Sequence, residues 1–212
     1  MADRIKVARL REEQIDAATR LVTEVFLIQL RVVGFEPDHE QQRSYRDGFL
    51  RLVRFFFAHG EPYAATIDGE VVGVALWMPP HTLETADEEA QEFGVTQLTD
   101  IFREPLGRLY ELDRKLRDIR EENMKAPHWF IALLNISPAR RGQGISKALL
   151  QPLLLRADEG ELPCYAETVL PDMVPFFERY GFAILAQGVD TSSGAPWWAL
   201  RREPKPLPEQ PE

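Results

Sequence analysis

The sequence predicts an α/β (α+β) fold in which helices flank a mixed, mostly antiparallel sheet of about seven strands. Two observations carry this prediction. The runs YAATI and EVVGVALWM flank Asp68-Gly69, and an Asp-Gly turn between β-branched runs indicates a hairpin. From residue 128 onward, apolar strand-like segments alternate with helical ones. We therefore expect the hairpin and this later series to share one sheet.

The N-terminal third is predicted to be largely helical. Residues 5–10 alternate as a first strand does, and apolar residues at helical spacing then indicate a helix over about 12–30. A second helix is expected over about 38–58, ended by Gly60. After the hairpin, the acidic residues 83–95 are expected to form a short helix.

A charged helix with an apolar stripe is expected over about 105–124, where Pro105 is placed to begin it. Its apolar residues recur every three to four positions, which puts them on one face. They are Leu109, Leu112, Leu116 and Ile119. We expect this stripe to pack onto the domain; the alternative is a partner helix.

The C-terminal part reads as an alternation of strands and helices. The run WFIALLNI is continuously apolar, which is typical of a strand buried on both faces. After it we expect a helix, a strand, a second helix and two closing strands, which are KALLQPLLLRA, LPCYAETVL, PDMVPFFERYG, FAILAQGV and PWWALRR. The predicted organisation is a single domain over 1–202 with a helical insertion at about 81–127. The proline-rich residues 203–212 are expected to be a flexible tail.

Composition excludes several classes of protein. The 212 residues fit one domain, and the net charge of −9 argues against binding to nucleic acid, which requires a basic surface. An acidic surface suits a cationic substrate but equally serves solubility. One cysteine, Cys164, forms neither an internal disulfide nor a zinc cluster. With no apolar run of signal-peptide or membrane-spanning length, we expect a cytoplasmic protein without a membrane partner.

The segment NISPARRGQGISKALL, from Asn135 to Leu150, predicts an anion site. A buried strand ends, a loop with two arginines and two glycines follows, and a helix begins at once. Backbone N–H groups at a helix start lack internal partners, and the helix dipole adds positive charge. Gly142 and Gly144 leave room for a phosphate to approach these groups. The pattern is neither a complete nucleotide P-loop nor a complete dinucleotide fingerprint, and a plain strand-to-helix turn is the alternative.

These residues resemble the phosphate-binding signature of the GNAT superfamily of N-acetyltransferases, R/Q-x-x-G-x-G/A, with Ser146 at the last position. The runs CYAET, VPFFERYGF and PWWALRR are also similar to family segments. From Trp129 to Arg201, and in VALWMPP, the chain looks most like the puromycin N-acetyltransferase type. The resemblance implies that the loop binds the pyrophosphate of acetyl-coenzyme A. The implied binding residues are Arg141, Gly142, Gln143, Gly144, Ile145 and Ser146.

The resemblance also implies a site for the rest of this co-substrate. In the family the fourth and fifth strands splay apart, the thioester lies between them, and no metal takes part. The backbone at Asn135, Ile136 and Ser137 would pair with the pantetheine arm almost as an added strand. The amine would attack the thioester carbonyl directly, while a backbone N–H stabilises the oxyanion.

Two catalytic candidates follow. Glu167 matches the glutamate on the family's fifth strand and would take the proton that an alkylamine must lose; a structural carboxylate is the alternative. Tyr180 is a candidate acid, because Phe177 occupies the position of the family's usual tyrosine and has no proton to give. His81 and His128 titrate in a useful range, but at strand edges they are expected to be surface or capping residues.

Two further departures surround the same position. Met173 and Val169 stand where the family has an asparagine and a small serine. An apolar lining suits a longer acyl chain, a greasy substrate or a protein that binds without turnover. The prediction is an N-acetyltransferase acting on a primary amine of a small molecule. The alternatives are a non-catalytic acyl-coenzyme A or ligand-binding protein and an acyltransferase for longer chains, as a monomer or homodimer.

Overall fold

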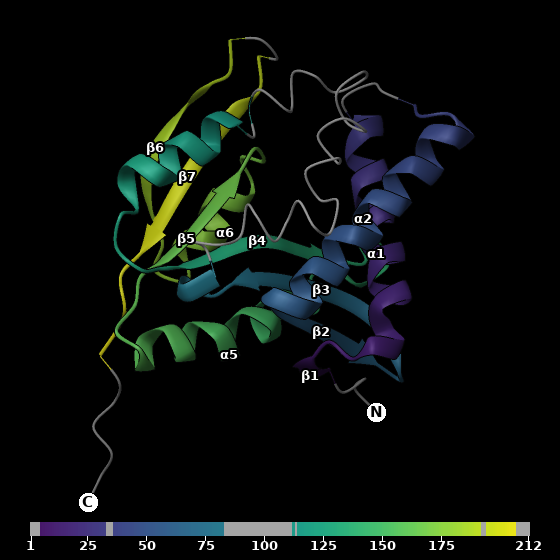
Figure 1. Cartoon of the computed structure of the whole chain (residues 1–212), viewed down its shortest axis with the longest axis horizontal. Helices are drawn as coiled ribbons and strands as arrows, with labels where there is room; N and C mark the ends of the chain where they lie inside the picture. The colour runs from purple at the N-terminus through teal and green to yellow at the C-terminus, as the bar shows by residue number, and fades with distance from the viewer. Residues whose placement is uncertain (1–4, 33–35, 83–111, 113, 192–193, 207–212) are drawn as a thin grey trace, which may run out of the picture.

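A single seven-stranded sheet organises the molecule (Figure 1). The computed structural model describes the chain except for residues 1–4, 33–35, 83–111, 113, 192–193 and 207–212. The strand order is β1-β2-β3-β4-β5-β7-β6, and every neighbouring pair is antiparallel except β4 and β5. The strands are β1 (Lys6–Arg9), β2 (Glu61–Ile67), β3 (Glu70–Met78), β4 (Trp129–Ile136), β5 (Cys164–Thr168), β6 (Ala183–Val189) and β7 (Pro196–Arg202). The predicted mixed, mostly antiparallel sheet with flanking helices is confirmed.

Helices cover both faces of this sheet (Figure 1). One face, here called the α1 face, carries α1 (Ile15–Val32), α2 (His39–His59) and a helical segment over 114–123. The other, the α5 face, carries α5 (Ile145–Glu159) and α6 (Met173–Glu178). Three short 3₁₀ turns complete the described elements: η1 (Glu12–Gln14), η2 (Pro80–Thr82) and η3 (Pro138–Arg140).

Local sequence signals set the N-terminal elements. Asp68 and Gly69 have φ angles of 51° and 87°, so both central residues of the β2–β3 turn lie in the left-handed region that a tight hairpin turn requires. Asp38 caps α2 by accepting hydrogen bonds from the amides of Glu40 and Gln41. Gly60 ends this helix, with its N–H bonded to the Phe56 carbonyl. The expected helices, hairpin and Gly60 stop are confirmed, whereas residues 83–95 lie outside the described part.

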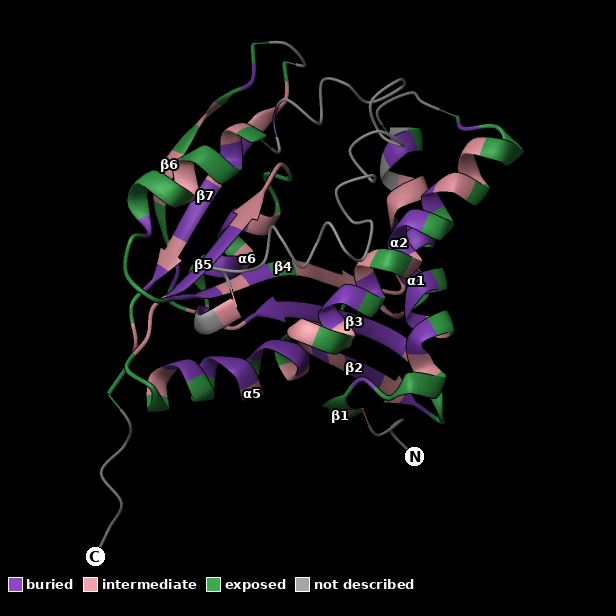
Figure 2. Cartoon of the chain, in the orientation of Figure 1, coloured by how far each residue is buried: buried purple, intermediate pink, exposed green. Residues whose placement is uncertain are grey.

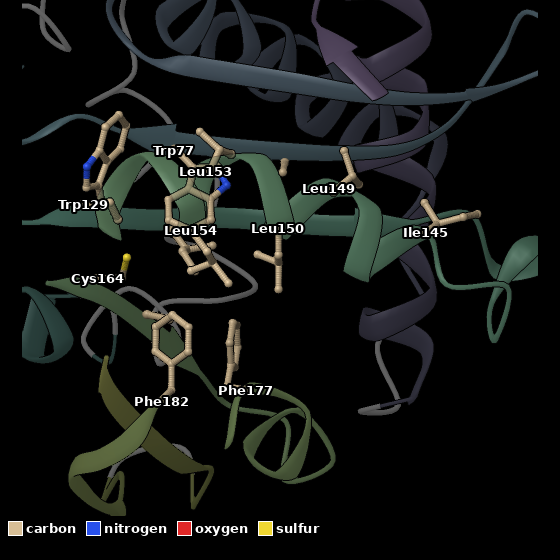
Figure 3. Packing of buried hydrophobic residues seen from close by; sticks show 14 of the residues in the cluster. Trp77, Trp129, Ile145, Leu149, Leu150, Leu153, Leu154, Cys164, Phe177 and Phe182 are labelled. Carbon is tan, nitrogen blue, oxygen red and sulfur yellow. The ribbon is translucent and has the colours of Figure 1, made fainter. Parts of the chain in front are cut away.

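The largest apolar core joins α5 to the sheet. Leucines along α5 pack against strand residues from β3, β4 and β5 and against Phe177 and Phe182 (Figure 3). Gly73 permits this close approach, because a Cβ there would lie 2.7 Å from Ile145 and 2.9 Å from Leu149. The first turn of α5 is therefore pressed directly onto β3. Burial follows the same pattern, with β3 and the inner side of α5 almost wholly enclosed (Figure 2).

An extra residue interrupts β4 at its centre. Leu76 of β3 pairs with Leu133 and Trp77 pairs with Ile131, which leaves Ala132 as a bulge. Pairing of β4 with β5 ends at the same level, at Ile131 and Ala166. Beyond this point the two strands diverge (Figure 1). A bulge bends and twists its strand, so the coincidence explains the divergence.

The divergence corrects one expectation. We expected WFIALLNI to be buried on both faces, but Ala132 is exposed and residues 133–136 are only half-buried (Figure 2). These residues lose their neighbour on the β5 side, so one edge of the strand is open. The apolar run predicted the strand correctly and its environment wrongly beyond Ile131.

The helical segment over 114–123 packs by its apolar stripe. Leu112 and Leu116 are buried against Trp197 of β7, and Ile119 lies beside them. Lys115 places its Nζ 5.1 Å from the centroid of the Trp197 ring. Packing onto the domain is thus confirmed for these residues, while Leu109 lies outside the described part.

A buried ion pair fastens the end of β7 to the end of α5. Arg202 donates two hydrogen bonds of 2.7 Å to the two carboxylate oxygens of Asp158, and its Nε donates to the Tyr180 carbonyl at 3.0 Å. The side chains are 3% and 10% exposed. The amide of Lys205 also donates to Asp158, so the chain stays attached to the domain beyond residue 203.

The ion pair predicts how stability depends on pH. Burial raises the pKa of Asp158, but the hydrogen bonds from Arg202 and the Lys205 amide outweigh it and hold the pKa below its usual range. The stabilisation is therefore complete above the unfolded pKa of about 3.9 and disappears as the pH falls through the lower folded pKa.

We expect Asp158→Asn to cost about 3 kcal/mol in unfolding free energy at neutral pH, because Arg202 is left buried without its partner. Urea unfolding at pH 7 and pH 3 measures this. The difference between the variant and the original protein should shrink at pH 3. An equal difference at both pH values would contradict the pair's assigned role, and Glu159→Gln, an exposed neighbour on α5, is the control.

Candidate active site

The loop between β4 and α5 is shaped for an anion. Gly142 and Gly144 have φ angles of 77° and 81°, which L-residues with side chains rarely adopt. A Cβ added at either position would meet no atom of the described residues within 4 Å. Glycine is thus required by the backbone conformation rather than by crowding, and the space above the loop is open.

The start of α5 supplies donors to this space. Gly144 is the N-cap residue, has no side chain to cap the helix, and accepts the hydrogen bond of the Ala148 amide. The amides of Ile145, Ser146 and Lys147 precede that first bond, so they have no acceptor within the helix. Arg140 and Arg141 lie on the same loop. These donors and the helix dipole favour a phosphate or pyrophosphate group here.

The distal half of β4 offers backbone groups to a ligand. Ser137 donates its N–H to the Val72 carbonyl at 2.9 Å, and antiparallel strands bond to one neighbour at every second residue. Asn135 therefore also faces β3, whereas Ile136 and Leu134 direct their N–H and C=O groups toward the open edge. Among the predicted backbone contacts, Ile136 thus has the orientation that an extended ligand would need. Leu134 is an additional residue that the sequence analysis missed.

Glu167 lies at the point where the strands part. It is the first residue of β5 beyond the last β4 pair, and it lies on the α1 face with Tyr165. Its side chain is 15% exposed. Arg120, from the 114–123 helix, lies with Nη1 4.0 Å from Glu167 Oε1 and its guanidinium 4.2 Å from the Phe130 ring centroid. A carboxylate, a guanidinium and an aromatic ring therefore converge on one face of the opening.

Two buried polar rings lie next to Glu167. Burial and the negative charge of Glu167 raise the pKa of Tyr165, whose hydroxyl faces that carboxylate without a hydrogen bond of ordinary geometry. His128 lies against Tyr165 with ring centroids 6.1 Å apart. At 7% exposure it is not the surface residue of our expectation, but its Nδ1 lies 2.9 Å from the Ala126 carbonyl, which fits the capping alternative.

The charge state of His128 follows from these surroundings. Burial lowers the pKa of His128, and the positive charges of Arg120 and Arg201 lower it further, against the opposing effect of the Ala126 hydrogen bond. The imidazole is accordingly neutral at pH 7. In the tautomer in which Nδ1–H donates to the Ala126 carbonyl, Nε2 carries no proton. This Nε2 is buried, and the described residues provide no hydrogen-bond partner for it. The side chain of His81 lies outside the described part.

Tyr180 and Phe177 lie on the opposite face from Glu167. Phe177 is 3% exposed and packs against Phe176 and Phe182 beneath α5 (Figure 3). Tyr180 follows α6 and borders a shallow surface cavity of about 230 Å³ beside Asp158 and the outer side of α5. The predicted candidates Glu167 and Tyr180 are therefore separated by the sheet. Tyr180 remains a predicted acid, and it lies on the α5 face of the sheet.

The described residues do not support a metal site or a cysteine nucleophile. They contain no group of three or more His, Cys, Asp or Glu side chains that could hold a metal ion. Cys164 is buried, and burial raises the pKa of its thiol to about 12, so it is not a nucleophile at neutral pH. Among the described helices, none has an apolar stretch long enough to cross a bilayer.

Residues 25–182 match the Acetyltransferase (GNAT) family. The chain belongs to this family. It is an acyltransferase by family, and GNAT acetyltransferases generally use acetyl-coenzyme A. The open β4–β5 edge and the amide-rich start of α5 are consistent with that co-substrate, because they provide strand-like pairing for an extended arm and donors for a pyrophosphate.

Solved structures share the fold at low sequence identity. A protein described as histone acetyltransferase HPA2 and related acetyltransferase, from Corynebacterium glutamicum, superposes with a TM-score of 0.64 at 21% identity, covering 97% of this chain and 99% of that one. A variant of agmatine N-acetyltransferase gives 0.59 at 15%, covering 95% and 100%. The ribosomal-protein-S18-alanine N-acetyltransferase of Escherichia coli gives 0.56 at 10%, covering 99% of both chains. At these identities the likeness shows the GNAT fold and not the acceptor.

The loop glycines allow a matched test. We expect Gly144→Ala to weaken coenzyme A binding at least about tenfold, because the strained residue displaces the first amides of α5. Gly69→Ala is the control: Gly69 has a φ of 87° with equally open space, but it lies in the β2–β3 turn. Both variants should lose about 1 kcal/mol of stability. Calorimetric titration and thermal unfolding measure the two effects, and equal loss of coenzyme A affinity in both variants would refute the assignment.

Proposed function

We propose that this protein transfers an acetyl group from acetyl-coenzyme A directly to a primary amine of a small molecule, in the manner of the puromycin N-acetyltransferase type. One observation carries the proposal: the opening between β4 and β5 has Glu167 at its apex, and the strand that forms one side runs straight into the phosphate-binding loop. Residues for both halves of the reaction thus lie along one continuous path. The proposed setting is the cytoplasm, with no nucleic acid or membrane partner and no metal, as a monomer or homodimer.

The co-substrate half rests on backbone groups. The amides of Ile145, Ser146 and Lys147 and the glycine loop would hold the pyrophosphate, with Arg141 adding charge. Ile136 and Leu134 would pair with the pantetheine arm along the open strand edge. Because these contacts come from main-chain atoms on packed elements, they would hold the thioester in one place relative to Glu167.

The acceptor half rests on Glu167. An alkylamine is mostly protonated at neutral pH and cannot attack until it loses a proton, which Glu167 would accept. The C–N bond then forms as the C–S bond breaks, the nitrogen gives up its second proton, and the departing sulfur takes up one. Phe177 offers none. A thiol with a pKa of about 8.5 leaves without full protonation, so turnover does not require that acid. Tyr180 remains the candidate donor on the α5 side.

A second function is favoured by one specific observation. Phe177 is enclosed in the core, so the position of the usual acid is closed as well as unreactive. A non-catalytic acyl-coenzyme A binding protein would have this property, as would an acyltransferase for longer chains. Thiol release with acetyl-, butyryl- and octanoyl-coenzyme A against a panel of amines separates the three cases. Binding of coenzyme A without turnover of any pair would establish the binding protein.

Glu167→Gln tests the proposed base. We expect kcat/KM to fall about 100-fold or more, because the amide cannot accept a proton, while coenzyme A affinity stays the same. Glu159→Gln, on the exposed end of α5, is the matched control. A fall in stability with an unchanged kcat/KM would assign Glu167 the structural role instead.

A further inference from the structure

The N–H donors of Arg120 have few acceptors among the residues that the structure describes. Its side chain is 17% exposed, and the guanidinium Cζ lies over the Phe130 ring, 4.2 Å from the ring centroid. Among the described residues, its guanidinium makes no hydrogen bond, and the nearest carboxylate oxygen is 4.0 Å away. A guanidinium has five N–H donors in a planar fork. Within the part of the chain that the structure describes, most of these donors therefore have no acceptor, at a place that solvent reaches only in part.

Arg120 lies where these donors could contact an acceptor substrate. Phe130 precedes the β4 bulge by two residues, and Glu167 follows the last β4–β5 pair. Arg120 bridges the two on the α1 face, and the helix that carries it is fixed by Leu112 and Leu116. It thus borders the spot at which the proposed base meets the amine.

We propose that Arg120 selects the acceptor, by binding a carboxylate on the carbon next to the amine, so that the acceptors are α-amino acids with apolar side chains. This rests on the proposed function and specifies its substrate. Glu167 receives the ammonium and Arg120 receives the carboxylate. Because the recognising groups are 4.0 Å apart, the two ligand groups must also be neighbours. The fork of Arg120 matches a carboxylate in a bidentate geometry.

The surrounding charges favour this class over amines with a second positive group. Arg120 carries one positive charge beside Glu167, and His128 is neutral because burial and the two nearby arginines lower its pKa. A diamine would place its second cation against Arg120 in a half-buried site, where like charges repel strongly. A zwitterionic acceptor pairs with both side chains. Phe130 is half-buried and provides adjoining apolar surface, and the enclosed ring of Tyr165 packs against it with ring centroids 6.0 Å apart.

Matched acceptors provide the test. Phenylalanine, its amide and phenethylamine share one skeleton and differ only beside the amine; leucine and 3-methylbutylamine form a second pair. We expect the original protein to prefer the carboxylate member in kcat/KM, mainly through KM. Arg120→Gln should reduce that preference at least about tenfold, which is the scale of one charge-assisted hydrogen bond. Arg120→Lys should fall between the two, and Arg117→Gln, exposed on the same helix, should match the original protein.

Several outcomes would overturn the proposal. A preference for phenethylamine or the amide, or a ratio that Arg120→Gln leaves unchanged, removes the carboxylate site. A loss of thermal stability with an unchanged ratio assigns Arg120 to structure. If coenzyme A binds but no amine is acetylated, the proposed function fails separately. Calorimetry with N-acetylphenylalanine and N-acetylphenethylamine then tests the carboxylate site by itself. The proposal expects the original protein to bind N-acetylphenylalanine more tightly than N-acetylphenethylamine, and Arg120→Gln to bind the two compounds equally.

Discussion

The extra residue at Ala132 is the feature on which the site depends. Regular pairing of β4 with both neighbours would have closed the sheet and left no strand edge for a ligand. The bulge instead lets β4 keep its bonds to β3 while it leaves β5 beyond Ile131. One residue thus creates an open edge inside a sheet whose described strands otherwise expose edges only at β1 and β6. Glu167 gains its place at the apex from the same divergence.

Close packing of α5 turns this opening into a complete site. The helix start must point its amides along the continuation of β4, and Gly73 permits this by admitting Ile145 and Leu149 against β3. At the other end, the pair between Arg202 and Asp158 holds α5 to β7, and Glu61 of β2 lies 3.1 Å from Arg156. The helix is therefore held at both ends and along its length, so its free amides have a fixed orientation.

Local signals predicted the parts that local physics controls. Asp68-Gly69 determines its own turn, and Gly142 and Gly144 are the residue type that adopts a positive φ most easily, so both features were visible in the sequence. The bulge was not, because WFIALLNI is uniformly apolar and nothing in it distinguishes Ala132. Burial of His128 depends on contact with Tyr165 of β5, which is distant in sequence. Arg120 looked like one more charge on a polar helix, and its interactions with Phe130 and Glu167 exist only after folding.

The two faces of the sheet divide the chemistry. Glu167, Arg120 and His128 gather on the α1 face, whereas Phe177 and Tyr180 belong to the α5 face. A proton that Glu167 would accept from an amine under the proposed function would therefore lie on the other side of the sheet from Tyr180 and could not pass to it directly. It must return through the opening between β4 and β5, the one place where the sheet is parted within the described strands. Acid and base would then act through the opening and not through a shared side-chain contact. A site with Phe177 at the position of the usual acid could still keep Glu167 as its base, because the two residues lie on different faces of the sheet.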